Sequence, residues 1–359
     1  MLAMLMIWMM LPLSFISPTS FFYTQPKKMS DLRVLEYSPL PTPRQLKAEL
    51  PLDEELRRLV NVHRAEVHDV LSGIDPRKLA IVGPCSVHDV DAVLEYAQRL
   101  ALFAPEISDR FLVVIRLYFQ KPRTRIGWTG LLDDPDLDAT FDVAKGIRMA
   151  RRLMREVTRL GLPIATELLG TTLEPQYLND LVSFGCIGAR TCESQIHRHL
   201  ASGVSFPMGF KNTSSGDVEK AVDACVCAAY PRVFLGIDED GRPSVVRTKG
   251  NSDTCVVLRG SYDAGPNDHR AAEVRARLAE EQVLPAVVVD CAHGNSGKTV
   301  QGQKDVFGRI VWGSVRGVML ESFLREGKQA APVCRGQSIT DPCLSFDDTV
   351  ALLRAARFS

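Results

Sequence analysis

The sequence predicts an α/β protein in which eight parallel strands and their covering helices close into a (β/α)8 barrel. From about residue 79 onward, short β-branched apolar runs alternate with longer segments of helical period, the pattern expected of repeated βα units around a parallel sheet. Eight such runs are present, and the 359-residue chain exceeds the ~250 residues that such a barrel needs. We therefore predict a TIM barrel with an N-terminal extension and an inserted β-hairpin.

The eight predicted strands are the short apolar runs themselves. In chain order they cover residues 79–85, 111–118, 163–169, 186–190, 207–212, 255–259, 286–293 and 315–321. Between them lie amphipathic stretches such as residues 141–161, whose apolar side chains recur at helical spacing on one face that would cover the sheet. These side chains are Phe141, Ala144, Ile147, Ala150, Met154 and Val157.

Three segments stand outside this alternation. Two apolar runs flank the turn DEDGR and predict a hairpin at about residues 232–249. Residues 29–78 contain prolines followed by a helical stretch, which we interpret as an N-terminal extension, so that the barrel covers residues 79–359. The apolar residues 1–28 lack the basic n-region of a signal peptide and contain a Ser/Pro/Thr cluster unsuited to a membrane helix. We interpret them as a non-native start before Met29 or a disordered extension, with a targeting segment as the alternative.

Charge and cysteine content exclude some classes of protein. The 43 basic residues balance the 43 acidic ones, which argues against a general nucleic-acid or anionic-membrane binder. The nine cysteines contain no CxxC pair and are odd in number, so they cannot form a complete disulfide framework. A cytoplasmic protein without nucleic-acid or membrane partners is therefore expected.

Every predicted strand ends in, or runs directly into, a residue capable of chemistry. In order these residues are Cys85, Arg116 with Lys121 just beyond it, Glu167, Arg190, Lys211, Arg259, His293 and Glu321. Any one of them alone is more often a structural residue, whereas together they favour a site. Because the carboxyl ends of barrel strands converge on one mouth, we expect a single site there.

The expected site divides into two chemical groups. The first consists of six cations that would repel one another without bound anions: Arg116, Lys121, Arg123, Arg190, Lys211 and Arg259. Phosphates and a carboxylate would satisfy them, because arginine binds such oxyanions bidentately. The second group consists of Cys85, His293 and Glu321, to which we add Asp341 from the loop SITDPC. A thiolate, an imidazole and two carboxylates suit one divalent ion of manganese, iron, cobalt or zinc, although a single cysteine or histidine is more often a packed core residue.

Taken together, several long segments resemble the class I, feedback-regulated microbial type of 3-deoxy-D-arabino-heptulosonate 7-phosphate (DAHP) synthase. The segments, in order, are GPCSVHD, RLYFQKPRTRIGWTGLLDDP, GARTCESQIHRHLASG, GFKN, LRG, DCAHGNSGK, VMLES and SITDPC. The resemblance runs from about Asp31 nearly to the end of the chain. It implies a metal-dependent transferase of the shikimate pathway. That enzyme condenses phosphoenolpyruvate with D-erythrose 4-phosphate and water to give DAHP and phosphate, on the route to chorismate and the aromatic amino acids.

The resemblance also implies roles for individual residues. The metal ligands would be Cys85, His293, Glu321 and Asp341. Phosphoenolpyruvate would contact Arg116, Lys121, Glu167, Ala189, Arg190, Lys211 and Arg259. Erythrose 4-phosphate would contact Arg123 and Thr124. Lys121, Glu167 and Asp341 would be catalytic. Lys121 would donate a proton to the new hydroxyl, and Glu167 would orient a water molecule.

The resemblance further implies an aromatic amino acid as feedback effector and a homodimer or homotetramer built partly by the N-terminal extension. The corresponding effector positions are Asp31, Pro175, Gln176, Leu200, Val204, Ser205, Phe234 and Gly236. Phenylalanine-sensitive members tend to carry serine at the position of Gly236. Because glycine would leave room for a phenolic hydroxyl, we expect tyrosine.

The chain departs from the family pattern near its last two ligands. The segments from His293 to Glu321 and from Glu321 to Asp341 are shorter than usual, and Pro342 stands where alanine is usual. Two alternatives therefore stay open. One is the related synthase that makes 3-deoxy-D-manno-octulosonate 8-phosphate from arabinose 5-phosphate, against which the motif KPRT argues. The other is a catalytically silent barrel that serves as a regulatory or binding subunit.

Overall fold

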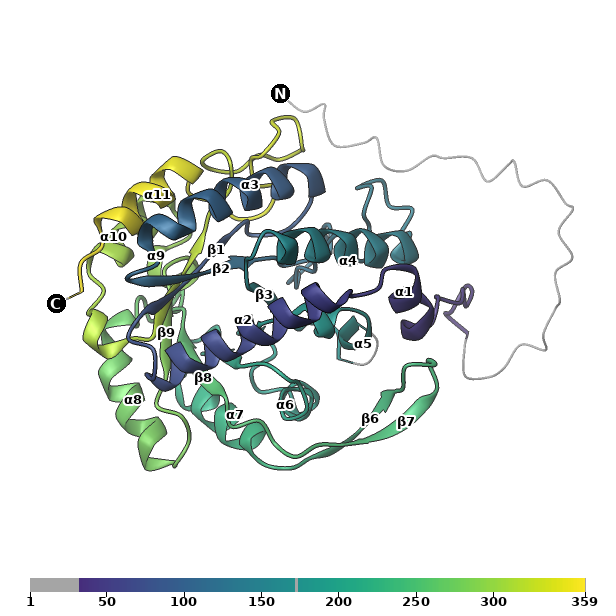
Figure 1. Cartoon of the computed structure of the whole chain (residues 1–359), viewed down its shortest axis with the longest axis horizontal. Helices are drawn as coiled ribbons and strands as arrows, with labels where there is room; N and C mark the ends of the chain where they lie inside the picture. Colours follow the sequence, from purple (N-terminus) through teal and green to yellow (C-terminus); the bar gives the residue numbers. More distant parts are fainter. Residues whose placement is uncertain (1–31, 172–173, 359) are drawn as a thin grey trace, which may run out of the picture. The chain divides into compact units, whose positions relative to one another are not determined.

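The computed structural model describes residues 32–171 and 174–358, and within them it contains a closed barrel of eight parallel strands (Figure 1). The strands follow the order β1-β10-β9-β8-β5-β4-β3-β2 around the barrel. Their bounds are β1 Lys78–Gly83, β2 Phe111–Arg116, β3 Ile164–Glu167, β4 Phe184–Ile187, β5 Met208–Lys211, β8 Thr254–Leu258, β9 Val287–Asp290 and β10 Gly317–Glu321. Each overlaps one predicted run, so the predicted barrel is confirmed.

Helices follow most of the barrel strands and cover the barrel from outside (Figure 1). Their bounds are α1 Pro43–Glu49, α2 Glu54–Ser72, α3 Val90–Phe103, α4 Val143–Arg159, α5 Glu174–Leu178, α6 Gln195–Ala201, α7 Glu219–Ala229, α8 Ala271–Glu280, α9 His293–Ser296, α10 Val300–Gly308 and α11 Phe346–Ala355. No helix among the described residues is both long and apolar enough to cross a membrane.

Alternation of side chains along the strands divides the core into two clusters. In β1, Leu79 and Ile81 belong to the cluster inside the barrel, whereas Ala80 and Val82 belong to the cluster between barrel and helices, as the two-residue period of a strand requires. Full burial of each such valine, leucine or isoleucine contributes about 1.5–3 kcal/mol. The barrel is therefore a packed scaffold whose mouth can hold side chains rigidly.

Helix α2 closes the N-terminal end of the barrel. Val67, Val70 and Leu71 in its last turns pack into the cluster inside the barrel. The helix begins at the N-cap Asp53, whose side chain accepts a hydrogen bond from the backbone N–H of Leu56. The compact unit that contains the barrel starts at Leu40, so α1 and α2, which we assigned to an extension, belong to the same unit. The proposed role of residues 29–78 in assembly stays a prediction, and residues 1–28 lie outside the described part.

Helix α4 corrects one detail of the predicted apolar face. Ile147, Ala150, Met154 and Val157 are buried as expected, but Phe141 is 59% exposed. The helix begins only at Val143, because Asp142 caps it by accepting a hydrogen bond from the N–H of Lys145. Phe141 therefore precedes the helix and does not share its face.

The inserted hairpin is also present. Strands β6 (Val233–Ile237) and β7 (Pro243–Arg247) pair antiparallel and follow α7. β6 packs against α6, and in Figure 1 the hairpin extends alongside the barrel toward α5. This arrangement lets residues of α5, α6 and β6 line one cavity outside the barrel.

Candidate active site

A cavity of about 190 Å³ opens at the carboxyl ends of the barrel strands. Most of the predicted site residues line it: Lys121, Arg123, Thr124, Glu167, Ala189, Arg190, Lys211, Arg259, His293 and Asp341. Cys85, Arg116 and Glu321 are buried and are not among the lining residues. The expected convergence on one barrel mouth therefore holds, with three members beneath the open space.

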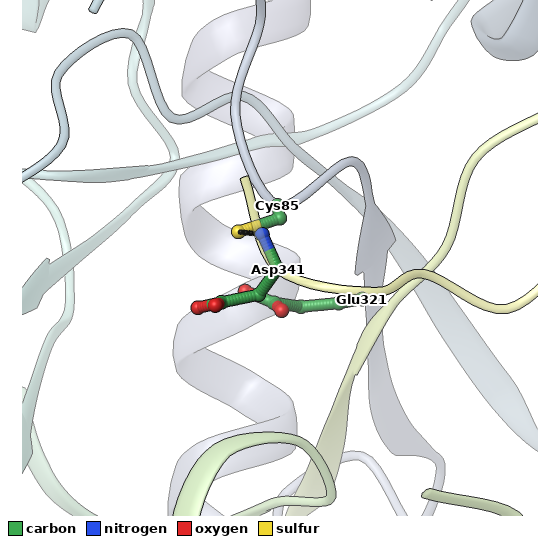
Figure 2. Close-up of side chains that lie close together, drawn as sticks. All are labelled: Cys85, Glu321 and Asp341. Atoms are coloured by element: carbon green, nitrogen blue, oxygen red, sulfur yellow. Dashed lines mark hydrogen bonds between the residues drawn. The ribbon is translucent and has the colours of Figure 1, made fainter. Parts of the chain in front are cut away.

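Cys85, Glu321 and Asp341 form a compact cluster of candidate metal ligands (Figure 2). They come from the end of β1, the end of β10 and the loop before α11, and their ligand atoms all lie within 4.8 Å of one another. The backbone N–H of Asp341 donates to Sγ of Cys85 at 3.3 Å. Metal–ligand bonds of ~2.0–2.3 Å keep the donors of one ion within roughly 4.5 Å of each other, so the cluster is close to the size of a metal centre.

His293 lies next to this cluster, on the side of Glu321. Its Nε2 is 3.7 Å from Oε1 of Glu321, and its Nδ1 is 2.9 Å from Oδ2 of Asp290. Burial lowers the pKa of His293, and Asp290 opposes that shift. An imidazole oriented by a carboxylate, with Nε2 directed at the cluster, is the arrangement found around metal-bound histidines. Three of the four predicted donors thus form one cluster whose size and chemistry suit a divalent ion, and His293 adjoins it on the side of Glu321.

Opposite charges keep the two carboxylates of the cluster ionised. Burial favours the neutral acid of Asp341, but Lys298 and Lys121 outweigh it and lower its pKa to about 2. Burial likewise opposes ionisation of Glu321, yet His293 and Arg116 lower its pKa. Cys85 differs, because burial and Glu321 raise the pKa of its thiol. A bound cation would favour the thiolate.

Arg116 occupies the floor of the site. Its Nη2 donates to Oε1 of Glu321 at 2.8 Å and to the carbonyl of Cys85 at 3.3 Å, and its Nε donates to the carbonyl of Pro84 at 3.2 Å. The guanidinium also stacks on the ring of Tyr118, 3.5 Å from its centroid. Because these contacts occupy its donors beneath the cavity, the predicted contact of Arg116 with phosphoenolpyruvate stays a prediction.

Lys121 links the cluster to the cavity. Its Nζ donates to both Sγ and the carbonyl oxygen of Cys85, each at 3.1 Å, and the side chain also lines the cavity. Burial disfavours its charge, but Cys85 and Glu321 outweigh burial and raise its pKa. Lys121 therefore presents a proton beside the candidate metal site.

Lys211 and Glu167 line the cavity from β5 and β3. Nζ of Lys211 lies 2.8 Å from Oδ2 of Asp290, the same oxygen that His293 approaches. Glu167 fits against β4 because a side chain at position 188 would clash with its Oε1, so that Gly188 leaves the necessary space. The wall of the cavity thus combines cations with two acidic groups, Glu167 and Asp341.

Arg190, Thr124 and Arg123 form the exposed side of the cavity. Nη2 of Arg190 donates to Oγ1 of Thr124 at 3.2 Å, and Nε of Arg123 donates to the carbonyl of Trp128 at 2.8 Å. The first contact joins the loop after β4 to the loop after β2, and the second lies within the loop after β2. Their free donors face a space open to solvent, which suits a phosphate group.

Sequence reasoning missed several residues of the site. Asp290 pairs with both Lys211 and His293, and its position three residues before His293 at a strand end is a signal that could have identified it. Lys298 lies 2.9 Å from Oδ1 of Asp341, and Tyr262 contacts Arg259. Tyr118 lies under Arg116. The last three have no distinguishing pattern in the sequence.

A second cavity, of about 320 Å³, lies between α5, α6 and β6. All seven predicted effector residues that fall within the described part line it: Pro175, Gln176, Leu200, Val204, Ser205, Phe234 and Gly236. Lys47, Arg64 and Asp180 add charged groups to its wall. Asp31, the remaining predicted effector residue, lies outside the described residues.

Comparisons with known proteins agree with this architecture. Residues 50–354 match the profile of the DAHP synthetase I family. The Schizosaccharomyces pombe protein named "phospho-2-dehydro-3-deoxyheptonate aldolase, tyrosine-inhibited" is 42% identical over 353 residues, covering 94% of this chain and 94% of its own. The Escherichia coli protein named "phospho-2-dehydro-3-deoxyheptonate aldolase, Phe-sensitive" is 42% identical over 334 residues, which cover 90% of this chain and 95% of that protein.

A solved structure is similar over nearly the same range. The phospho-2-dehydro-3-deoxyheptonate aldolase from Francisella tularensis is 40% identical and superposes with a TM-score of 0.86. The superposition covers 89% of this chain and 96% of that chain. The likeness therefore extends over most of both chains.

Proposed function

The chain belongs to the DAHP synthetase I family, and we propose that its barrel mouth condenses phosphoenolpyruvate with D-erythrose 4-phosphate and water to give DAHP and phosphate. One observation supports this proposal above the others. A cavity lined by six cations adjoins a cluster of thiol, imidazole and carboxylate groups; the cations are Lys121, Arg123, Arg190, Lys211, Arg259 and Lys298. Two phosphorylated substrates, one of which is also a carboxylate, match that charge distribution.

The cations divide between the two substrates. Arg190 and Arg259 would bind the phosphate of phosphoenolpyruvate, with Ala189 beside them, while Lys121 and Lys211 would bind its carboxylate. Arg123 and Thr124 would bind the phosphate of erythrose 4-phosphate. Holding two repelling anions in contact removes both the electrostatic and the entropic cost of their encounter in water.

A divalent ion held by Cys85, His293, Glu321 and Asp341 would supply Lewis-acid polarisation of the aldehyde oxygen. The donor set supports manganese, iron, cobalt or zinc. Arg116 acts from below, because its contact with Glu321 fixes the carboxylate and balances its charge. Asp290 likewise fixes the imidazole of His293 through its contact with Nδ1.

The reaction forms one carbon–carbon bond and one carbon–oxygen bond, the latter from water, and it breaks the carbon–oxygen bond to phosphate. C3 of phosphoenolpyruvate attacks the aldehyde carbon of the sugar phosphate, and Lys121 donates its proton to the oxygen that becomes the new hydroxyl. Water, oriented by Glu167, adds its oxygen at C2. One of its protons passes to solvent and the other to the departing phosphate as the bond between C2 and the phosphate oxygen breaks, which leaves a ketone at C2. The position of Lys121 supports its role as an acid, because its Nζ lies 3.1 Å from Sγ of Cys85 and the side chain lines the cavity.

The second cavity would take an aromatic amino acid as feedback effector. Apolar groups such as Pro175, Leu200, Val204 and Phe234 suit an aromatic ring, and the charged groups beside them suit an amino acid backbone. Gly236 favours tyrosine over phenylalanine, since the absence of a side chain there leaves room for a phenolic hydroxyl. A homodimer or homotetramer, assembled partly by residues 29–78, and a cytoplasmic location complete the proposal.

Release of phosphate by the purified protein tests the activity and separates it from its alternatives. Release from phosphoenolpyruvate is expected with erythrose 4-phosphate and not with arabinose 5-phosphate. The opposite preference would indicate the octulosonate synthase. Absence of release with either sugar, in a sample shown to contain metal, would indicate a silent barrel.

A further inference from the structure

Tyr262 contacts Arg259 in two ways at the rim of the barrel mouth. Arg259 follows β8 and is only 4% exposed, and Tyr262 lies on the loop three residues later. Nη2 of Arg259 donates to the phenolic oxygen of Tyr262 at 3.2 Å, while Nη1 donates to the carbonyl of Gly260 at 3.1 Å. Cζ of Arg259 lies 5.1 Å from the centroid of the Tyr262 ring, within the range of a cation–π contact.

The same ring also approaches a second cation. Nζ of Lys298, which lies between α9 and α10, is 5.6 Å from the ring centroid. Lys298 in turn pairs with Asp341 at 2.9 Å. Tyr262, Arg259 and Lys298 all line the cavity, so one aromatic side chain connects the cations of two different βα loops.

We infer that Tyr262 is a positioning residue for the phosphate of phosphoenolpyruvate, which it serves by fixing the guanidinium of Arg259. The inference rests on the proposed function, in which Arg259 binds that phosphate. Guanidinium is planar and carries five N–H donors in a fixed fork. The contacts to Gly260 and Tyr262 each use a donor on a different Nη and thereby set the plane. The remaining donors are then oriented before the substrate arrives.

The contribution of the hydroxyl can be separated from that of the ring. Tyr262→Phe keeps the ring and removes the acceptor, so Arg259 loses one of its two fixed hydrogen bonds. A hydrogen bond involving a charged group corresponds to about a tenfold change in affinity. We expect Tyr262→Phe to raise KM for phosphoenolpyruvate about 5- to 10-fold and to leave KM for erythrose 4-phosphate within about twofold. Tyr262→Ala, which also removes the cation–π contact, should raise KM for phosphoenolpyruvate further.

A matched control distinguishes positioning from a general effect on the fold. Tyr230, at the C-terminal end of α7, is 60% exposed and does not line the cavity at the barrel mouth. Tyr230→Phe makes the same chemical change and should leave both KM values at the wild-type level. Thermal unfolding of each variant shows whether the fold is retained.

A double-mutant cycle tests whether Tyr262 acts through Arg259. Calorimetric binding of phosphoenolpyruvate is measured for wild type, Tyr262→Phe, Arg259→Ala and the double variant. Tyr262→Phe should weaken binding in the wild-type background and have no further effect once Arg259 is absent. Equal weakening in both backgrounds, or none in wild type, would overturn the inference.

The same proteins separate failure of this inference from failure of the proposed function. Wild-type protein that releases phosphate with erythrose 4-phosphate, together with a Tyr262→Phe variant of unchanged KM, would refute the role of Tyr262 alone. Wild-type protein that binds phosphoenolpyruvate without turnover would refute the proposed function. In that case the binding cycle still decides whether Tyr262 positions Arg259.

Discussion

Arg116 and Glu321 form a buried ion pair across the floor of the barrel mouth, with Nη2 2.8 Å from Oε1 and side-chain exposures of 1% and 2%. They end β2 and β10, the two strands that flank β1. Cys85 follows β1 and completes the group. The pairing of β2 and β10 with β1 therefore brings the Arg116–Glu321 ion pair next to the thiol of Cys85.

Removal of Arg116 should destabilise the protein. Arg116→Met leaves the carboxylate of Glu321 buried without its partner, which we expect to lower the free energy of unfolding by about 3–5 kcal/mol. Urea denaturation of metal-free protein measures the loss. The double variant Arg116→Met with Glu321→Leu removes both charges and should recover much of it. A single variant as stable as wild type would show that the pair does not govern the floor of the site.

Asp290 should control metal affinity although it is not one of the four candidate ligands. Asp290→Asn weakens the orientation of His293 and leaves Lys211 without its buried partner, so we expect metal affinity to fall about 10- to 100-fold. Competition with a chelator measures that affinity. Asp268→Asn, which removes the partner of Arg309 outside the mouth, is the control and should leave it unchanged. The same metal affinity in Asp290→Asn as in Asp268→Asn would contradict the role of Asp290.

Glu174 should make stability depend on pH above the ordinary range of a carboxyl group. Burial, together with Asp133 and Glu167, raises its pKa to about 8, against the single opposing hydrogen bond from the N–H of Gly170. The pKa of Glu174 is raised in the folded state relative to the unfolded state. Its contribution to the free energy of unfolding is therefore fully present below about pH 4.5 and is lost as the pH rises toward 8.

Glu174→Gln tests this dependence, since it removes the titrating group. Its stability relative to wild type should increase between about pH 4.5 and 8 by about 1–3 kcal/mol. Denaturation curves at several pH values check this. A constant difference between variant and wild type over that range would show that Glu174 titrates normally.

Gly236 should determine which aromatic amino acid inhibits. A Cβ at this position would lie 2.8 Å from Cγ2 of Val246, so Gly236→Ser would narrow the cavity. We expect it to raise the half-inhibitory concentration of tyrosine about tenfold, a change of about 1.4 kcal/mol in binding, and to leave phenylalanine less affected. Leu235→Ser places the same side chain on the neighbouring, 81% exposed position and should change neither. Selective inhibition of the wild type by phenylalanine would contradict the expectation of tyrosine.

Patterns of residue type identified the strands and most of the candidate site. Short β-branched apolar runs between segments of helical period predicted all eight barrel strands, because strands that are buried on both faces consist of consecutive apolar residues. The polar residues at strand ends predicted the mouth, because parallel strands in a barrel share one direction. The effector residues, in contrast, were predicted only from the family resemblance, since no local pattern relates them.

What the sequence could not predict depends on direction and on long-range contact. Arg116 stands at a strand end like Lys211, but it turns beneath the cavity toward Glu321, and only the strand order reveals this. Phe141 has helical spacing with Ile147, yet the cap at Asp142 starts the helix after it. Tyr262 lies in an irregular loop, so its contact with Lys298 follows from tertiary structure alone.

Metal content and turnover, measured on the same samples of wild type and Lys121→Met, test the central claim most directly. Wild-type protein should lose release of phosphate from phosphoenolpyruvate and erythrose 4-phosphate on chelation and regain it with a divalent ion. Lys121→Met should bind the ion and show kcat lower by at least about 10²-fold. Full turnover by metal-free wild-type protein would contradict the assignment of Cys85, His293, Glu321 and Asp341 to a catalytic metal site.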